Sequence, residues 1–167
     1  SALFGTTDVF NINLENGTSA AITSYGTVTA ANVETINITT VDTGKIGTDG
    51  KNVLATQDTA TLVATSATKI VVTGNNGLDL TNAGNTKVTT FDASAVAGDN
   101  VEDTAADLGV VYASATTVAA NTADTVVTII GGAGNDTLTG NNTIDIITGG
   151  AGKDILAGLA GADIINV

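Results

Sequence analysis

An aspartate returns every nine residues in the carboxy-terminal part of the chain, at Asp136, Asp145, Asp154 and Asp163. A glycine lies five residues before each aspartate, and Leu or Ile lies two residues after it. Ca²⁺ prefers roughly six to eight oxygen ligands, supplied by carboxylates and main-chain carbonyls. Glycine-rich turns can direct successive carbonyl oxygens inward, because glycine adopts positive φ without a steric penalty. The residue types and their spacing therefore predict calcium-binding turns.

The four nonapeptides, which span 131–139, 140–148, 149–157 and 158–166, are not identical. The first and third, "GGAGNDTLT" and "GGAGKDILA", fit the pattern GGxGxDxUx, in which U is a large apolar residue. The second, "GNNTIDIIT", lacks two of the glycines, and the fourth, "GLAGADIIN", lacks one. All four keep the opening glycine, the aspartate and the apolar residue.

Two nonapeptides are expected to make one winding, so that repeats one and three stack on one edge and repeats two and four on the other. Each edge then has two half-shells of oxygen ligands with Ca²⁺ between them. In the core, Leu138 is expected to stack over Leu156, and Ile147 over Ile165. The alternative is a metal-free β-helix whose aspartates only cap turns. That arrangement leaves like charges facing one another across adjacent windings.

Short segments rich in Thr, Val and Ile run along the rest of the chain, separated by Gly, Asn, Asp and Ser. These residues favour pleated strands and turns. Apolar residues recur at steps of 18, as in Ile70 and Val88, in Leu62 and Leu80, and in the series Val111, Ile129, Ile147 and Ile165. The sequence predicts an all-β fold, a right-handed parallel β-helix or β-roll solenoid with Ca²⁺-binding turns.

Residues 1–130 are expected to form a parallel β-helix with irregular first rungs, and 131–167 a nonapeptide β-roll continuous with it. An acidic segment near 97–109 carries Asp99, Glu102, Asp103 and Asp107, and is interpreted as a solvated loop or a further cation site. The segment 74–80, "GNNGLDL", is a degenerate echo of the nonapeptide and a second candidate for metal binding.

The formal net charge of −12 arises from 17 acidic residues against five lysines, and there is no arginine. This balance disfavours nucleic acid and anionic lipid as partners and favours hard cations. No apolar run approaches the roughly 20 residues that span a bilayer, so direct membrane insertion is not expected. Because the chain also lacks His, Cys and a zinc motif of the HExxH type, we expect it not to be an enzyme.

The repeats resemble the RTX family of calcium-binding nonapeptide proteins, which Gram-negative bacteria export by type I secretion. The segments "NVETINITT" and 62–96, followed by the "GGAGND" repeats, are similar to the carboxy-terminal part of RTX-type surface-layer proteins, as in Caulobacter. This resemblance implies a cell-surface protein that Ca²⁺ folds after export and that assembles with copies of itself into a two-dimensional lattice. Lipopolysaccharide attachment would require a part of such a protein not present here.

The resemblance also implies the calcium ligands. The first edge would use Gly132, Gly134 and Asp136 with Gly149, Ala151 and Asp154, and the second edge Asn141, Thr143 and Asp145 with Gly158, Ala160 and Asp163. Asn141 and Thr143 stand where the family has glycine, so the second site is expected to be weaker.

Two other functions stay open. An RTX adhesin or ice-binding repeat region would present a ladder of outward threonines, but Thr137 and Thr139 are followed one winding later by Ile155 and Ala157. A secretion or folding module of a secreted RTX enzyme is the other. Ile146 and Ile164 are expected to be outward-facing neighbours, either through ordinary β-propensity or as a patch for subunit contact.

Overall fold

The computed structural model describes residues 8–17, 22–43, 57–98, 104–117 and 125–167. These residues form β-strands and turns and contain no helix, so no membrane-spanning helix lies among them. The strands are β1 (Val9–Asn16), β2 (Ser24–Thr29), β3 (Thr35–Asp42), β4 (Asp58–Val63), β5 (Lys69–Gly74), β6 (Leu78–Asn82), β7 (Thr90–Val96), β8 (Val110–Ala113), β9 (Val126–Ile130), β10 (Thr137–Thr139), β11 (Ile144–Thr148), β12 (Ile155–Ala157) and β13 (Ile164–Asn166).

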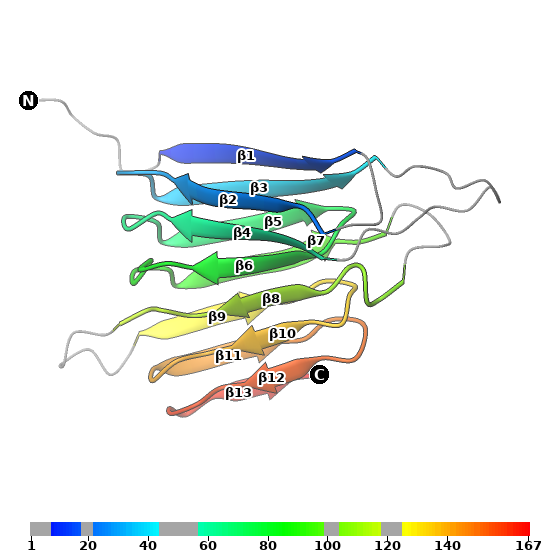
Figure 1. The fold of residues 1–167 in the computed structure, drawn as a ribbon. Helices are drawn as coiled ribbons and strands as arrows, with labels where there is room; N and C mark the ends of the chain where they lie inside the picture. Colours follow the sequence, from blue (N-terminus) through cyan, green and yellow to red (C-terminus); the bar gives the residue numbers. More distant parts are fainter. Residues whose placement is uncertain (1–7, 18–21, 44–56, 99–103, 118–124) are drawn as a thin grey trace, which may run out of the picture.

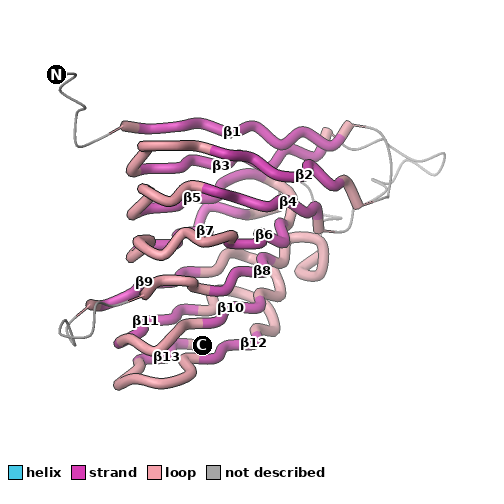
Figure 2. Tube along the Cα trace, turned by 60° about the vertical axis from the view of Figure 1, so that its left-hand side comes forward, coloured by secondary structure: helices cyan, strands magenta, loops and turns pink. Residues whose placement is uncertain are grey.

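The strands build two parallel sheets, and the chain passes between them. One sheet has the order β1-β3-β5-β7-β9-β11-β13, and the other has the order β12-β10-β8-β6-β4-β2. Each winding thus adds one strand to each sheet, and successive windings stack along one axis (Figures 1 and 2). The all-β, parallel architecture expected from the sequence is confirmed.

The core lies between the two sheets and is built from columns of side chains in register. One column of the seven-stranded sheet runs through Phe10, Ile36, Ile70, Phe91, Ile129, Ile147 and Ile165. A column of the six-stranded sheet runs through Ala60, Leu80, Tyr112, Leu138 and Leu156. Because side chains alternate between the faces of a strand, one residue in two reaches this narrow interior.

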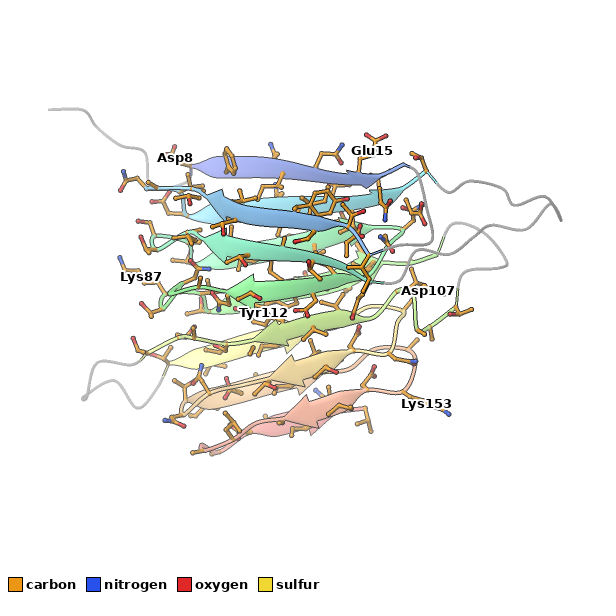
Figure 3. The ribbon with its side chains drawn as sticks, in the orientation of Figure 1. Asp8, Glu15, Lys87, Asp107, Tyr112 and Lys153 are labelled. Atoms are coloured by element: carbon orange, nitrogen blue, oxygen red, sulfur yellow. The ribbon has the colours of Figure 1, made fainter. Side chains whose placement is uncertain are left out.

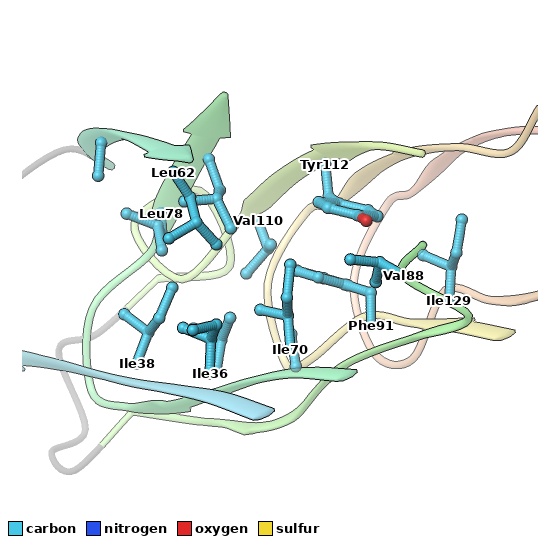
Figure 4. Close-up of a cluster of buried hydrophobic side chains, with 14 of the residues drawn as sticks. Ile36, Ile38, Leu62, Ile70, Leu78, Val88, Phe91, Val110, Tyr112 and Ile129 are labelled. Carbon is cyan, nitrogen blue, oxygen red and sulfur yellow. The ribbon is translucent and has the colours of Figure 1, made fainter. Parts of the chain in front are cut away.

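An aromatic pair links the sheets in the middle of the stack. The rings of Phe91 from β7 and Tyr112 from β8 are stacked with centroids 3.8 Å apart (Figure 4). Both side chains are buried, and the Tyr112 hydroxyl accepts a hydrogen bond from Asn82 Nδ2 at 3.2 Å. The first nonapeptide winding continues these columns, since Leu138 lies beside Tyr112 and Ile129 beside Phe91.

The constant step of 18 residues holds only in the carboxy-terminal windings. Ile129, Ile147 and Ile165 are in register as expected, but Val111 belongs to the other sheet, where it pairs with Thr137. The other two expected pairs are also wrong. Ile70 pairs with Phe91 rather than Val88, and Leu62 pairs with Asn82 rather than Leu80. The earlier windings differ in length because their turns do, so strand register cannot be counted from a fixed period.

β9 joins the nonapeptide windings to the rest of the chain. It pairs with β7 on one side and with β11 on the other, so the seven-stranded sheet continues across residue 130. The same holds in the six-stranded sheet, where β10 lies between β8 and β12.

Candidate calcium centres

The four nonapeptide turns are divided between the two edges of the stack. We call the edge formed by turns 131–136 and 149–154 the first edge; these turns lead from the seven-stranded sheet into the six-stranded sheet. The second edge contains the turns that end at Asp145 and Asp163 and lead back. The first edge is the one that carries the labelled Asp107 and Lys153 in Figure 3. Repeats one and three therefore stack, as do repeats two and four.

Three of the four repeated aspartates accept a hydrogen bond from a main-chain amide of the preceding winding. Val110 N donates to Asp136 Oδ1 at 2.6 Å, and Asp136 N donates to Asp154 Oδ1 at 2.9 Å. On the second edge, Asp145 N donates to Asp163 Oδ1 at 3.0 Å. Each of these three carboxylates thus fixes the register of two neighbouring windings.

The opening glycine of every nonapeptide lies against the aspartate of the same repeat. A Cβ added at Gly131, Gly140, Gly149 or Gly158 would lie less than 3.0 Å from Oδ2 of Asp136, Asp145, Asp154 or Asp163, respectively. Such an approach does not occur between real atoms, so a side chain at this position would displace the carboxylate. This contact explains why all four repeats keep both residues even though their other positions vary.

The six first-edge residues expected to bind calcium lie together in the two stacked turns. Ala151 N donates to the Gly132 carbonyl oxygen at 3.0 Å. Gly150 and Gly152 face the carbonyl oxygens of Gly132 and Gly134 and have φ of 104° and 122°. Only residues without a side chain fit here, because the backbone is left-handed and the next winding is in contact. The turn thus brings carbonyl and carboxylate oxygens into one small region.

The six second-edge residues are also brought together, but side chains take part in closing this turn. Asn141 Oδ1 accepts from Thr143 N at 2.7 Å, and Asn141 Nδ2 donates to Ser114 Oγ at 2.8 Å. Ala160 N donates to the Asn141 carbonyl oxygen at 3.2 Å. Leu159, at the position of the second glycine, has φ of 70°. A non-glycine residue in this region is strained, so the second edge departs from the glycine pattern in both of its turns.

Burial makes Asp136 and Asp145, the earlier aspartate of each stacked pair, hard to ionise when no cation is present. The pKa of Asp136 is raised to about 6, chiefly by desolvation and also by the neighbouring Asp154, while the hydrogen bonds from Val110 and Gly132 oppose the rise. Desolvation also raises the pKa of Asp145, with Asp163 adding to the effect and the Asn141 amide opposing it. Both side chains are fully buried. A bound cation would stabilise the ionised form that burial disfavours.

These donors fit a hard divalent cation. Each edge pairs two carboxylates with carbonyl oxygens of two stacked turns, which is an all-oxygen set of the kind that Ca²⁺ accepts. The glycines keep free the space beside each carboxylate that a Cβ would fill. No cluster of three or more acidic, His or Cys side chains occurs among the described residues, so main-chain oxygens must supply the rest of the ligand shell. When bound, calcium would supply the positive charge between the stacked turns.

The two other segments singled out from the sequence do not repeat this geometry in the described part of the chain. Asp79 of the "GNNGLDL" echo pairs with Val111, whose neighbour is Thr137, and so lies one residue away from the column of Asp136. In the acidic segment, Asp99, Glu102 and Asp103 lie outside the described residues. Asp107 Oδ2 accepts from the amide and hydroxyl of Thr104 within its own turn.

Sequence reasoning missed a third aspartate in the column of Asp136 and Asp154. Register places Asp58, Leu78, Val110, Asp136 and Asp154 at equivalent positions of successive strands of the six-stranded sheet. Asp58 is fully buried. The available signal was an apolar residue two positions after the aspartate, Ala60, as in the nonapeptides.

The fold and these edges define a parallel β-roll with paired, oxygen-rich turns. Residues 130–165 match the family of RTX calcium-binding nonapeptide repeats (HemolysinCabind), in four copies. This part of the chain is thus similar to RTX repeats, which are calcium-binding motifs, and calcium is the metal ion that this match supports. RTX repeats are typical of secreted, extracellular proteins. A comparison with curated proteins finds no match.

Proposed function

We propose that this chain is the calcium-folded part of a structural protein in the surface layer of a Gram-negative bacterium. In this proposal, type I secretion exports the chain, extracellular Ca²⁺ orders the RTX windings, and the ordered protein assembles with copies of itself into a two-dimensional lattice. The observation that carries the proposal is the stacking of Asp136 on Asp154 and of Asp145 on Asp163, in which one side chain serves both strand register and the candidate metal site.

Calcium would act as a folding ligand rather than a catalytic one. Extracellular modules bind Ca²⁺ at roughly 10⁻⁴ to 10⁻³ M, so the repeats would order outside the cell and not in the cytosol. The twelve residues of the two edges would hold the ions, with the first edge stronger. We propose a non-enzymatic role, since the four carboxylates are hydrogen-bonded to strand or turn amides. A right-handed solenoid is the hand expected for parallel strands joined by crossovers.

A patch on the outside of the seven-stranded sheet supports self-assembly. Its members are the outward-facing apolar residues of β9, β11 and β13, namely Val126, Ile130, Ile144, Ile146 and Ile164. Ile146 and Ile164 are stacked neighbours, and Val126 lies beside Ile144. We call this set the outer apolar patch. Three of its five residues lie on β11 and β13, which calcium would order, so contact between copies would depend on calcium.

The outward faces of the earlier windings of the same sheet are more polar. Asn37 Nδ2 donates to Asn11 Oδ1 at 2.9 Å, and Thr39 and Thr73 bring their hydroxyls within 3.3 Å. The change from polar to apolar along one sheet face supports a subunit contact at the RTX windings.

The ice-binding alternative is not favoured. A threonine ladder does exist on the six-stranded sheet, where Thr27, Thr61 and Thr81 are in register. It is broken at the next winding, because Ala113 occupies the column before Thr139. An irregularity between Ser24 and Thr27 also disturbs its first rung. A flat, regular array of hydroxyls is therefore not formed.

Assembly can be followed by light scattering and circular dichroism while Ca²⁺ is added to chelated protein. We expect β-signal to rise first and large particles to follow, and Mg²⁺ at the same concentration to produce neither effect because it dehydrates reluctantly and demands octahedral geometry. The proposal is contradicted if particles form equally in chelator, or if full β-signal develops in calcium without any association at high protein concentration.

A further inference from the structure

The column that contains Asp136 and Asp154 changes from acidic to apolar and back to acidic residues along the stack. Its members in successive windings are Asp58, Leu78, Val110, Asp136 and Asp154. The aspartates at 136 and 154 face each other across adjacent windings, whereas Asp58 is separated from them by two apolar rungs. Leu78 and Val110 are fully buried. Asp58 therefore has no carboxylate neighbour in this column.

Asp58 is satisfied entirely by neutral donors. Its Oδ1 accepts from Asn16 Nδ2 at 3.1 Å and from Thr23 N at 2.9 Å. Its Oδ2 accepts from the Tyr25 hydroxyl at 3.2 Å and from Asn76 Nδ2 at 2.9 Å. Hydrogen bonds of this kind stabilise a buried carboxylate without a cation. Asp136 accepts from two main-chain donors and has a carboxylate beside it in the next winding. Its carboxylate therefore has fewer hydrogen-bond donors than that of Asp58 and an additional negative neighbour.

The Asp58 donors come from several windings. Asn16 belongs to β1, Thr23 and Tyr25 lie at the start of β2, and Asn76 lies in the turn before β6. Asp58 thus connects strands of both sheets in the first three windings. In a calcium-dependent turn, this connecting role falls to the metal ion.

Apolar packing is concentrated in the same windings. Most of the largest fully buried side chains lie in β3 to β8, namely Val72 and the side chains labelled in Figure 4 as Ile36, Ile38, Leu62, Ile70, Leu78, Phe91 and Tyr112. Leu138 of β10 and Ile147 of β11 are also fully buried, whereas in the final winding Leu156 is only partly buried and Ile165 is 46% exposed. Apolar burial is the dominant favourable contribution to folding, so the windings of β3 to β8 gain more stability from it than the final winding does.

We propose that the windings built from β1 to β9 fold without calcium and serve as the template on which calcium orders β10 to β13. In this template, Asp58 holds neighbouring windings together without a metal ion, as the RTX aspartates would do with calcium. The proposal rests on the proposed role of calcium as a folding ligand for the repeats, but not on lattice assembly. The exposed edges of β8 and β9 would provide the hydrogen-bonding register for the first nonapeptide winding.

Hydrogen exchange of the whole chain, read strand by strand with and without calcium, tests this template. In chelator we expect the amides of β3 to β7 to stay protected and those of β10 to β13 to exchange as in an unfolded chain, with calcium restoring the second group. Loss of protection in β3 to β7 together with β10 to β13 on chelation would overturn the template. Protection of β10 to β13 that does not respond to calcium contradicts the proposed function instead.

A pair of matched variants separates the two kinds of aspartate. We expect Asp58→Asn to reduce protection of β2 to β6 in chelator, because an NH2 group then replaces one carboxylate oxygen and faces the two donors that this oxygen accepted from. We expect the half-saturating calcium concentration of β10 to β13 to stay within about twofold. We expect Asp136→Asn to raise that concentration about tenfold or more and to leave β3 to β7 unchanged in chelator. Equal effects of both variants on calcium binding would overturn the division.

Discussion

The main-chain amide of Asp136 donates to Oδ1 of Asp154, 2.9 Å away and one winding further along the chain. The opening Gly149 of the later repeat lies against the other oxygen of that carboxylate. One side chain is thus held by the strand before it and by its own turn. A cation that moves this carboxylate must also move the register of β10 and β12, so metal binding and strand pairing are coupled at this residue.

Removing one carboxylate from each edge should weaken calcium binding unequally. We expect Asp136→Asn to raise the half-saturating calcium concentration about tenfold or more, since a buried charged ligand is lost. We expect Asp145→Asn to have a smaller effect, because the Asn141 side chain already closes the second-edge turn through its hydrogen bonds with Thr143 N and Ser114 Oγ. Calcium titration monitored by circular dichroism measures both.

Asp79→Asn is the matched control for these variants. It removes the same charge from the outer face of the six-stranded sheet, one residue away from the Asp136 column. We expect the calcium dependence of this variant to stay within about twofold of the parent protein. If Asp79→Asn weakens calcium binding as strongly as Asp136→Asn, net charge rather than the edge geometry governs the affinity.

The positive φ at Leu159 offers a stabilising substitution. Leu159 is 67% exposed, so Leu159→Gly loses little packing and relieves a strained backbone at φ of 70°. We expect a gain of up to about 1 kcal/mol in the calcium-loaded protein, measured by urea unfolding. The reverse change on the first edge, Gly150→Leu, should abolish ordering there, because its Cβ would collide with the Gly132 carbonyl. A loss of stability in Leu159→Gly would show that the leucine side chain packs in the assembled turn.

Protons and calcium should have opposite relations to the order of the repeats. The ordered state raises the pKa of Asp136 from 3.8 to about 6, so it binds a proton more strongly than the unordered chain in this range. In calcium-depleted protein, β-signal should therefore increase as the pH falls from about 6 towards 4, and should be lost as the pH rises through that window. Calcium needs the ionised carboxylate, so its apparent affinity should fall over the same range.

Circular dichroism of calcium-depleted protein across this pH range checks the first effect, and calcium titrations at about pH 5 and 7 check the second. Asp136→Asn supplies the comparison, because it removes the titrating group. We expect the pH dependence to be flatter in this variant. A calcium affinity that is equal at both pH values would contradict the role of the buried carboxylates.

The outer apolar patch predicts where copies meet. We expect Ile146→Thr with Ile164→Thr to reduce calcium-dependent association at least about tenfold while leaving the β-signal intact, since Thr keeps the β-branched shape that strands favour. Ile155→Thr is the control, because Ile155 is an exposed isoleucine on the outside of the other sheet. Sedimentation of all variants in calcium measures their association. Equal loss of association in Ile155→Thr would place the contact elsewhere.

The repeat period predicted the RTX windings well because their turns have constant length. With nine residues per half-winding, Leu138 and Leu156 fall in one column, and Ile147 and Ile165 in another. No such constancy holds earlier. Lys69 and Thr90 are partners at a separation of 21 residues, while Leu78 and Val110 are 32 apart. Spacing alone could not assign these partners, because insertions in turns leave the alternation within each strand intact.

The twelve residues expected at the calcium sites could be grouped from the sequence because every ligand lies in a turn of known phase. The hydrogen bonds of the carboxylates could not be predicted in this way. The bond from Val110 N to Asp136 spans a winding of 26 residues, and no repeat in the sequence has that length. The role of Asp58 was hidden for the same reason, since its four donors lie between 18 and 42 residues away.

Because every winding adds one strand to each sheet, the length of the molecule grows in fixed steps. Neighbouring strands lie about 4.8 Å apart, so each additional pair of nonapeptides lengthens the protein by that amount and leaves its cross-section unchanged. Duplication or deletion of 18 residues can therefore adjust the reach of such a protein in small, equal steps. A pair of repeats inserted after Thr148 would extend both columns of buried isoleucine and leucine without altering any existing turn.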